Sequence, residues 1–430
     1  MKPLIICLSL LLIISQSLTG QTLQSDMQFW RPYDQRGINV FETGKADTVA
    51  FDGIKVRVGG AFAQQFQSLS HSNSATARFN EGGVNLNQLM DIGSGFNLAT
   101  ANLNLDVALA DGIRLNLVTY LSSRHHPESW VKGGYLQFDK LKFLNSEVFD
   151  QIMERVTIKV GHMEINYGDA HFRRSDNGNA FYNPFVGNYI MDAFTTEIGG
   201  EVIYQHEGLL AVASVTGGEI QGGITNPGRR KPTFIGKLGY DKYVADDVRV
   251  RLTGSVYTTS GSVSNTLWGG DRAGSRYYLV MENTLATTAG NFTSGRFNPG
   301  QRDNVTAFVL NPFVKVGALE FFGNLEQSKG KAANETVDRK WNQVGADLLY
   351  RFGAQDKYYM AARYNQVSGE LTADVDASIN RVQVGGGWFI TKNVLAKVEY
   401  VNQKYQDFPG LDIRNGGKFN GLMIEGVIGF

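Results

Sequence analysis

Strict alternation of apolar and polar residues runs through most of the chain and constrains its fold more than any other feature. Residues 102–109 read Asn-Leu-Asn-Leu-Asp-Val-Ala-Leu. The tight-turn signal Asp111-Gly112 follows, and residues 113–118 alternate again. A period of two places apolar side chains on one face of a β-strand and polar side chains on the other. The chain is therefore expected to be all-β.

Sixteen such segments can be traced, each about 9–13 residues long, which is the length that a tilted strand needs to cross a bilayer. They begin near residues 53, 96, 113, 130, 155, 196, 209, 232, 248, 305, 319, 340, 357, 379, 393 and 420. Tyr277–Met281 is assigned to a loop.

The connections between these segments alternate in length. The short ones are 111–112, 207–208, 242–247, 317–318, 353–357 and 391–393, with one longer member at 139–154. The mostly long ones are 69–95, 123–129, 165–195, 218–231, 260–304, 329–339, 368–378 and 406–419. Short periplasmic turns and long extracellular loops are typical of outer-membrane barrels, so we predict a transmembrane antiparallel β-barrel of about 16 strands.

The two ends of the chain fit export and barrel closure. Residues 1–20 have the charged start, apolar run and small polar end of a secretory signal peptide, and the run is too short to span a membrane. Residues 21–52 are polar and are expected to form a periplasmic arm or a small plug, with the barrel over 53–430. The last strand, ending at Phe430, looks like that of Gram-negative outer-membrane proteins, which implies recognition by the barrel-assembly machinery.

Composition and motifs argue against several other functions. The 41 basic and 41 acidic residues balance, whereas a nucleic-acid partner would require a basic excess. None of the six His residues forms a metal pair at helical spacing, and neither a Gly-x-Ser-x-Gly elbow nor a phosphate-binding loop occurs. Asp176–Asn179 is better explained as a turn than as a calcium loop. We expect no enzyme activity, no cofactor and no metal site.

On the register of the strands, basic side chains that point into the barrel outnumber acidic ones. Charged rings inside a pore set its ion selectivity, so these residues predict a modest preference for anions. The residues expected to line the lumen are Lys55, Arg57, Arg114, Lys237, Arg249, Arg251, Arg351, Arg363 and Arg381.

Residues 165–195 form a long connection rich in aromatic residues and arginine, and long loops of this kind are usually functional. We expect the segment to fold into the lumen and to set the constriction; the alternative is a lid packed over the barrel mouth. The residues expected at the constriction are Asp169, Arg173, Arg174 and Asp176.

The segment Val156–Gly168 resembles the strand and following loop of porins of the phosphate-selective O/P type. That resemblance implies a 16-stranded trimeric anion channel in the outer-membrane lipid. The chain departs from the family pattern because no dense ladder of Arg and Lys runs down the lumen. We therefore expect passive diffusion of small hydrophilic solutes, with a modest preference for anions or phosphate, through a homotrimer.

Three rival functions remain open. A hydrophobic-compound channel of the fatty-acid transporter type would use residues 21–52 as a hatch, but few apolar residues point inward beyond Phe322, Leu349 and Phe389. A non-conducting barrel could serve a surface or secretion assembly, with 260–304 as its binding face. An outer-membrane enzyme has the least support.

Overall fold

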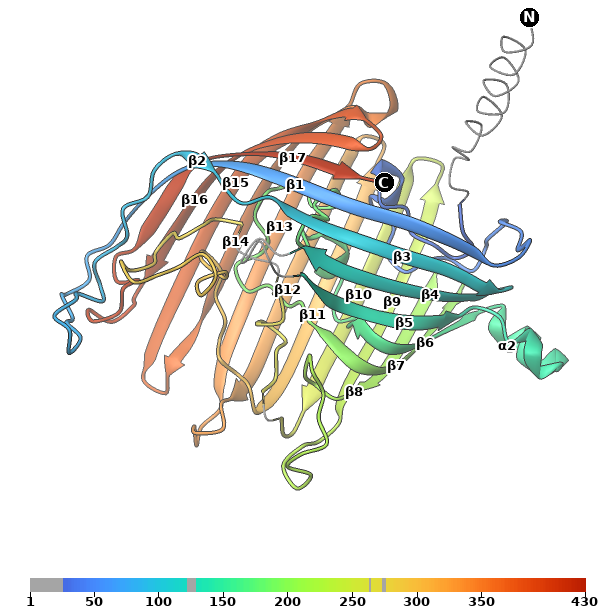
Figure 1. Ribbon diagram of the computed structural model, residues 1–430, viewed down its shortest axis with the longest axis horizontal. Helices are drawn as coiled ribbons and strands as arrows, with labels where there is room; N and C mark the ends of the chain where they lie inside the picture. The colour runs from blue at the N-terminus through green and yellow to red at the C-terminus, as the bar shows by residue number, and fades with distance from the viewer. Residues whose placement is uncertain (1–25, 122–128, 263, 273–275) are drawn as a thin grey trace, which may run out of the picture.

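The computed structural model describes residues 26–121, 129–262, 264–272 and 276–430. The predicted signal peptide and most of the connection predicted at 123–129 lie outside these residues. The described part is a barrel whose wall is made of long tilted strands (Figure 1). The strands are β1 (Lys55–Ser72), β2 (Gly95–Phe96), β3 (Thr100–Ala110), β4 (Ile113–Leu121), β5 (Ser129–Phe138), β6 (Val156–Glu164), β7 (Thr196–His206), β8 (Leu209–Thr216), β9 (Thr233–Ala245), β10 (Val248–Thr259), β11 (Asn304–Val316), β12 (Leu319–Lys331), β13 (Arg339–Phe352), β14 (Tyr358–Thr372), β15 (Val375–Thr391), β16 (Val394–Gln406) and β17 (Lys418–Gly429).

Helical structure among these residues is confined to short segments. They are the 3-10 turns η1 (Gln35–Gly37), η2 (Lys142–Leu144), η3 (Ala170–Arg173) and η4 (Ala354–Asp356), and the α-helix α2 (Glu147–Met153). No helix in the described part of the chain is long and apolar enough to cross a membrane.

The sheet closes on itself. Each long strand pairs antiparallel with its neighbour in the chain, and β1 pairs with both β3 and β17. Lys55 lies opposite Ala108 on one side, and Ala61 lies opposite Gly429 on the other. The two-residue β2 is an addition to the edge of β1. The predicted antiparallel barrel of sixteen strands is confirmed, with one extra short strand, and Tyr277–Met281 lies in a loop as expected.

The strands are inverted relative to those of a water-soluble protein. In β13, Asp347 and Arg351 point inward and are buried, whereas Leu348 and Tyr350 point outward and are about half exposed. A closed barrel leaves no unpaired edge and can therefore present an apolar outer face to lipid. The alternation read from the sequence thus gives the correct face for these residues.

Two details of the connections differ from expectation. The connection predicted at 368–378 is not long, because β14 and β15 extend into it and only Ala373 and Asp374 separate them. The connection between β5 and β6 is more than a turn, because it contains η2 and α2. The alternation is incomplete at these strand ends, so the sequence analysis placed the end of β14 too early and the start of β15 too late.

The interior of the barrel is packed rather than open along its full width. Residues 165–195 lie inside it, and their apolar side chains, such as Ile190 and Met191, pack against the inner wall. The expectation of few inward apolar residues was wrong, since Val305, Ile379 and Val401 are also buried on the inner face. Phe322, Leu349 and Phe389 are buried there as well.

Candidate functional site

The segment 165–195 is held inside the barrel by polar contacts between its backbone and inward-facing wall residues. The Lys397 ammonium donates to the Ala180 carbonyl at 2.9 Å, and Arg363 donates to the Gly187 carbonyl at 3.1 Å. The Glu399 carboxylate accepts from the Val186 amide at 2.7 Å. Buried backbone groups need such partners. The inward charges of β14 and β16 therefore fix the path of this segment.

Residues 26–47, which we call the N-terminal arm, occupy the barrel end that carries the short connections. In porin topology this end faces the periplasm. Tyr33 and Trp30 donate to the Asp106 carboxylate of β3 at 2.6 and 3.1 Å. The Arg31 guanidinium donates to the Phe172 carbonyl at 3.0 Å, so the arm also contacts the segment 165–195.

Asp169, the first of the predicted constriction residues, is fully buried in a charge cluster. Its carboxylate lies 2.9 Å from Lys237 and 2.8 Å from Arg251, and Glu42 of the arm contacts the same two cations at 3.2 and 2.7 Å. Burial alone would raise the pKa of Asp169, but the charges of Lys237 and Arg251 outweigh burial and hold it below its ordinary value. The cluster joins the wall, the loop and the arm.

The two predicted constriction arginines have different surroundings. Arg174 is ion-paired with Asp192 at 2.7 Å and with Asp271, a residue of the later loop 264–303. Arg173 donates to Asn39 of the arm and lies over the Phe313 and Phe322 rings, 5.4 and 5.1 Å from their centroids. Neither guanidinium is a free charge in water.

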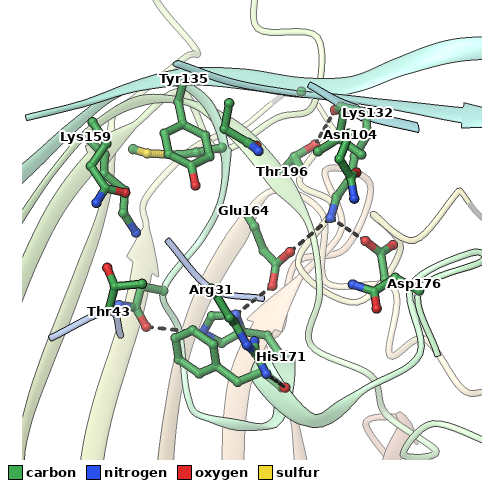
Figure 2. Close-up of a pocket in the computed structure, with 18 of the residues that line it drawn as sticks. Arg31, Thr43, Asn104, Lys132, Tyr135, Lys159, Glu164, His171, Asp176 and Thr196 are labelled. Carbon is green, nitrogen blue, oxygen red and sulfur yellow. Dashed lines mark hydrogen bonds and ion pairs between the residues drawn. The ribbon is translucent and has the colours of Figure 1, made fainter. Parts of the chain in front are cut away.

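A cavity of about 220 Å³ lies between the inner wall formed by β3–β7 and the segment 165–195. Figure 2 shows Lys132 reaching both Glu164 and Asp176, with Arg31 and His171 on another side. Five basic and three acidic residues line it. They are Arg31, Arg114, Lys132, Lys159 and Arg174 with Glu42, Glu164 and Asp176. Of the predicted constriction residues, Arg174 and Asp176 line this cavity, whereas Asp169 and Arg173 are not among its lining residues.

Most cations of the cavity have a carboxylate partner. Lys132 lies 3.0 Å from Glu164 and also contacts Asp176, and Lys159 lies 3.2 Å from Glu201. Arg31 differs, because it donates to the carbonyls of Gly37 and Phe172 and forms no ion pair with a described carboxylate. Its guanidinium stacks on Tyr182 instead, 3.7 Å from the ring centroid. Burial lowers the pKa of Arg31, but a guanidinium stays protonated in proteins.

The His171 ring also lines this cavity. Its Nδ1 lies 2.7 Å from Glu164, and its Nε2 lies 3.2 Å from the Asn166 side chain. Burial lowers the pKa of His171 below its ordinary value, although the hydrogen bond with Glu164 acts in the opposite direction. No group of three or more His, Asp or Glu side chains in the described ranges is placed to hold a metal ion.

The nine basic residues predicted to line the lumen all sit on the inward side of their strands. Six of them are buried: Arg114, Lys237, Arg251, Arg351, Arg363 and Arg381. Arg249 pairs with Asp241 at 2.7 Å, Lys55 pairs with Asp52 at 2.6 Å, and Arg57 lies over Trp30. Of the nine, only Arg114 lines the cavity, and several of the others pair with carboxylates of neighbouring strands, such as Arg351 with Glu320 and Arg363 with Asp347.

Phe430, the predicted assembly signal, lies beside β1. Its amide donates to the Gly60 carbonyl at 3.0 Å, and its ring is about half exposed. A recognition role for this residue stays a prediction.

Sequence reasoning missed Arg31, Glu164 and His171 as cavity residues. Arg31 lies in a segment without periodicity, so only its cluster of aromatic neighbours, Trp30 and Tyr33, could have indicated that it is buried. Glu164 and His171 flank the end of β6, where alternation stops. The loop 260–304 was considered as an outward binding face, yet Tyr277 within it donates to Glu399 inside the barrel at 2.6 Å.

Comparison with known proteins supports the fold at a distance. No family model and no curated protein matches the chain. An anion-selective porin from Comamonas acidovorans has 12% identity and a TM-score of 0.52, over 88% of this chain and 100% of that one. The outer-membrane channel DcaP of Acinetobacter baumannii has 10% identity and a TM-score of 0.51, over 89% and 99%. The trimer form of the Vibrio cholerae outer-membrane protein OmpT has 13% identity and a TM-score of 0.51, over 88% and 100%.

These likenesses extend over nearly the whole chain, but their identities are low. They therefore show the fold alone, which is that of the 16-stranded outer-membrane porins.

Proposed function

We propose that this chain forms a channel in a Gram-negative outer membrane and that small hydrophilic solutes diffuse through it passively, with a modest preference for anions. The cavity between the wall and the segment 165–195 carries the proposal. Its volume of about 220 Å³ lies below the ~300–1,000 Å³ of common ligand pockets, which favours small solutes. Its five basic against three acidic lining residues favour anions.

Arg31 is the residue to which we assign the preference. The basic residues of the strands are largely paired with carboxylates of neighbouring strands, of the arm and of the segment 165–195, so their fields are mostly cancelled. Arg31 faces the cavity and forms no ion pair with a described carboxylate, although Glu164 and Glu42 line the same cavity and act on its pKa. A guanidinium that stacks on a tyrosine ring and donates to backbone carbonyl groups keeps its positive charge, which acts on a passing solute.

The N-terminal arm is proposed to narrow the periplasmic end. Its contacts with β3, with the Lys237–Arg251 pair and with the segment 165–195 all lie inside the barrel mouth. A homotrimer is proposed as the assembly, supported by the trimer form of the Vibrio cholerae OmpT structure, which has this fold.

The test is the conductance of the purified protein in a planar bilayer, with the reversal potential measured under a salt gradient. The wild type is expected to give small conductance steps and a reversal potential of the sign that indicates a preference for anions. Arg31→Gln is expected to move the reversal potential toward zero. Arg36→Gln is the matched control, since Arg36 lies on the same arm but is exposed and paired with Asp34 at 2.9 Å.

Each outcome decides a different part of the proposal. Steps without ion preference in the wild type would keep the channel and reject the role of Arg31. A silent bilayer from correctly folded protein would reject the channel and favour a barrel that serves a surface assembly.

A further inference from the structure

The connection between β5 and β6 is the exception at the periplasmic end. Every other connection there has five residues or fewer, whereas residues 139–155 hold both η2 and α2. Figure 1 shows α2 standing clear of the barrel wall, beyond the ends of β5 and β6. Asp139, at the start of this segment, pairs with Lys45 of the arm at 3.0 Å, and no residue of the segment lines the cavity.

The helix α2 is strongly two-sided. At about 100° per residue, Val148, Phe149, Ile152 and Met153 fall on one arc. The polar residues Glu147, Asp150 and Gln151 fall on the opposite arc. A sequence this short gains little from helix propensity alone, so its two-sidedness indicates a surface that covers the apolar arc.

The barrel itself covers only one edge of that arc. Met153 is 3% exposed and packs toward the barrel, whereas Val148, Phe149 and Ile152 are 65%, 43% and 46% exposed. Phe143 and Leu144, just before the helix, are 61% and 43% exposed. Five large apolar side chains in twelve residues are therefore unpartnered in the isolated chain, which marks an interaction surface.

The outward faces of β5 and β6, which carry apolar side chains, lie directly next to this segment. Leu136 of β5 and Val160 of β6 point outward and are exposed. The apolar arc is thus continuous with a surface that the barrel fold already places against acyl chains. The helix has only seven residues, too few for the roughly 800 Å² that a stable protein partner buries on each side.

We propose that α2, together with Phe143 and Leu144, lies on the periplasmic leaflet as an interfacial anchor, with its apolar arc among the lipids of that leaflet. Its acidic arc faces the periplasm. Amphipathic helices of low overall hydrophobicity bind at the boundary between headgroups and acyl chains in this way. The anchor fixes the depth of the β5–β6 wall in the membrane.

Site-directed spin labelling can test this proposal, because the sequence contains only one cysteine that must be removed first. Cys7 is replaced by serine, and one cysteine is introduced at Phe149, Ile152 or Leu144 and spin-labelled in the full chain. The protein is placed in nanodiscs of phosphatidylethanolamine and phosphatidylglycerol. Collision with oxygen reports lipid, and collision with a water-soluble nickel complex reports the aqueous phase.

Two label positions calibrate the measurement. Val160→Cys is the lipid-facing reference, and Gln151→Cys is the matched control on the polar arc of the same helix. The labels at Phe149 and Ile152 are expected to favour oxygen, as at Val160, and the label at Gln151 is expected to favour nickel. Leu144→Cys repeats the depth measurement outside α2 if a helix variant fails to fold.

Two results would overturn the proposal. Strong nickel collisions at Phe149 and Ile152, equal to those at Gln151, would place the helix in water. Low collision rates with both reagents would mean that protein covers the arc, as in contact with a second copy of the chain.

Discussion

Arg31 lies over the ring of Tyr182, with 3.7 Å between the guanidinium carbon and the ring centroid. The two residues come from the N-terminal arm and from the segment 165–195, which are far apart in the chain. A second link, from Tyr182 to the Pro32 carbonyl, joins the same two segments. The arm and the infolded segment therefore act as one internal body, and the cavity lies between this body and the wall.

Lys132 is expected to influence ion selectivity more strongly than Arg31. Lys132→Met removes a cation and also uncovers two carboxylates, Glu164 and Asp176, whereas Arg31→Gln removes a charge only. The reversal potential of Lys132→Met should therefore move further toward cations than that of Arg31→Gln. Lys315→Met is the control, because Lys315 lies 3.8 Å from Glu320 and does not line the cavity. Equal shifts in all three variants would contradict this order.

The binding of the N-terminal arm to the barrel wall is expected to depend on pH through Glu42. Burial would raise the pKa of Glu42, but Lys237 and Arg251 outweigh it and lower the pKa from 4.5 to about 2. A lowered carboxyl pKa stabilises the docked arm fully above pH 4.5, and this contribution is lost as the pH falls from 4.5 toward 2. Conductance should stay constant from pH 7 to 4.5 and rise only below that range.

Glu42→Gln should show the larger conductance already at pH 7, because the neutral amide cannot pair with Lys237 or Arg251. Asp26→Asn is the control, since Asp26 is exposed and its contact with Arg36 at 3.3 Å is at the surface. A rise in wild-type conductance between pH 7 and 5 would show that another group holds the arm.

Asp169→Asn is expected to destabilise the barrel. The substitution leaves Lys237 and Arg251, both buried, with one carboxylate partner fewer. Breaking a buried ion pair on one side costs about 3–5 kcal/mol. Asp338→Asn removes a carboxylate 3.5 Å from the exposed Lys329, and such surface pairs contribute about 0–1 kcal/mol. Urea midpoints of the two variants are read from the gel mobility of unheated samples. Equal midpoints would show that Glu42 and Asp241 balance the two cations without Asp169.

The strand register could be predicted from sequence, but the partners of the inward charges could not. A period of two is a local signal, so Lys237 and Arg251 were correctly placed on the inner face. Their carboxylates come from elsewhere: Asp169 is 68 residues from Lys237, and Glu42 is 209 residues from Arg251. No pattern in the arm or in the loop shows which wall residue it contacts, because irregular segments have no fixed period. The excess of inward positive charge could therefore be predicted from the sequence, but its neutralisation by carboxylates of the arm and the loop could not.

The helix α2 was missed for a related reason. Seven residues give fewer than two helical turns of pattern, and the segment lies between strands whose alternation dominates the neighbourhood. Apart from Met153, its apolar residues have no partner in the barrel. A short amphipathic segment of this kind becomes recognisable only once the strand ends on both sides are known.

Gly178 is expected to be essential for the position of the infolded segment. A Cβ atom there would meet the Ala61 carbonyl oxygen at 2.6 Å and the Ala101 Cα atom at 2.7 Å, both of which are backbone atoms of the wall. Because the wall cannot move, Gly178→Ala should push the turn 176–179 toward the cavity and break the bond from the Gly178 amide to Asn102 at 3.0 Å. Overpacking of this kind costs about 1–3 kcal/mol. The displaced turn should also loosen the contacts of Asp176 with Lys132 and Tyr120.

Single-channel recordings should therefore show more frequent current fluctuations for Gly178→Ala, together with a lower urea midpoint. Gly426→Ala is the matched control on β17, since an added Cβ there meets no atom within 4 Å. Steady currents and an unchanged midpoint for Gly178→Ala would show that the turn has room to shift without disturbing Asp176, and that the cavity is bounded by the remainder of the segment 165–195.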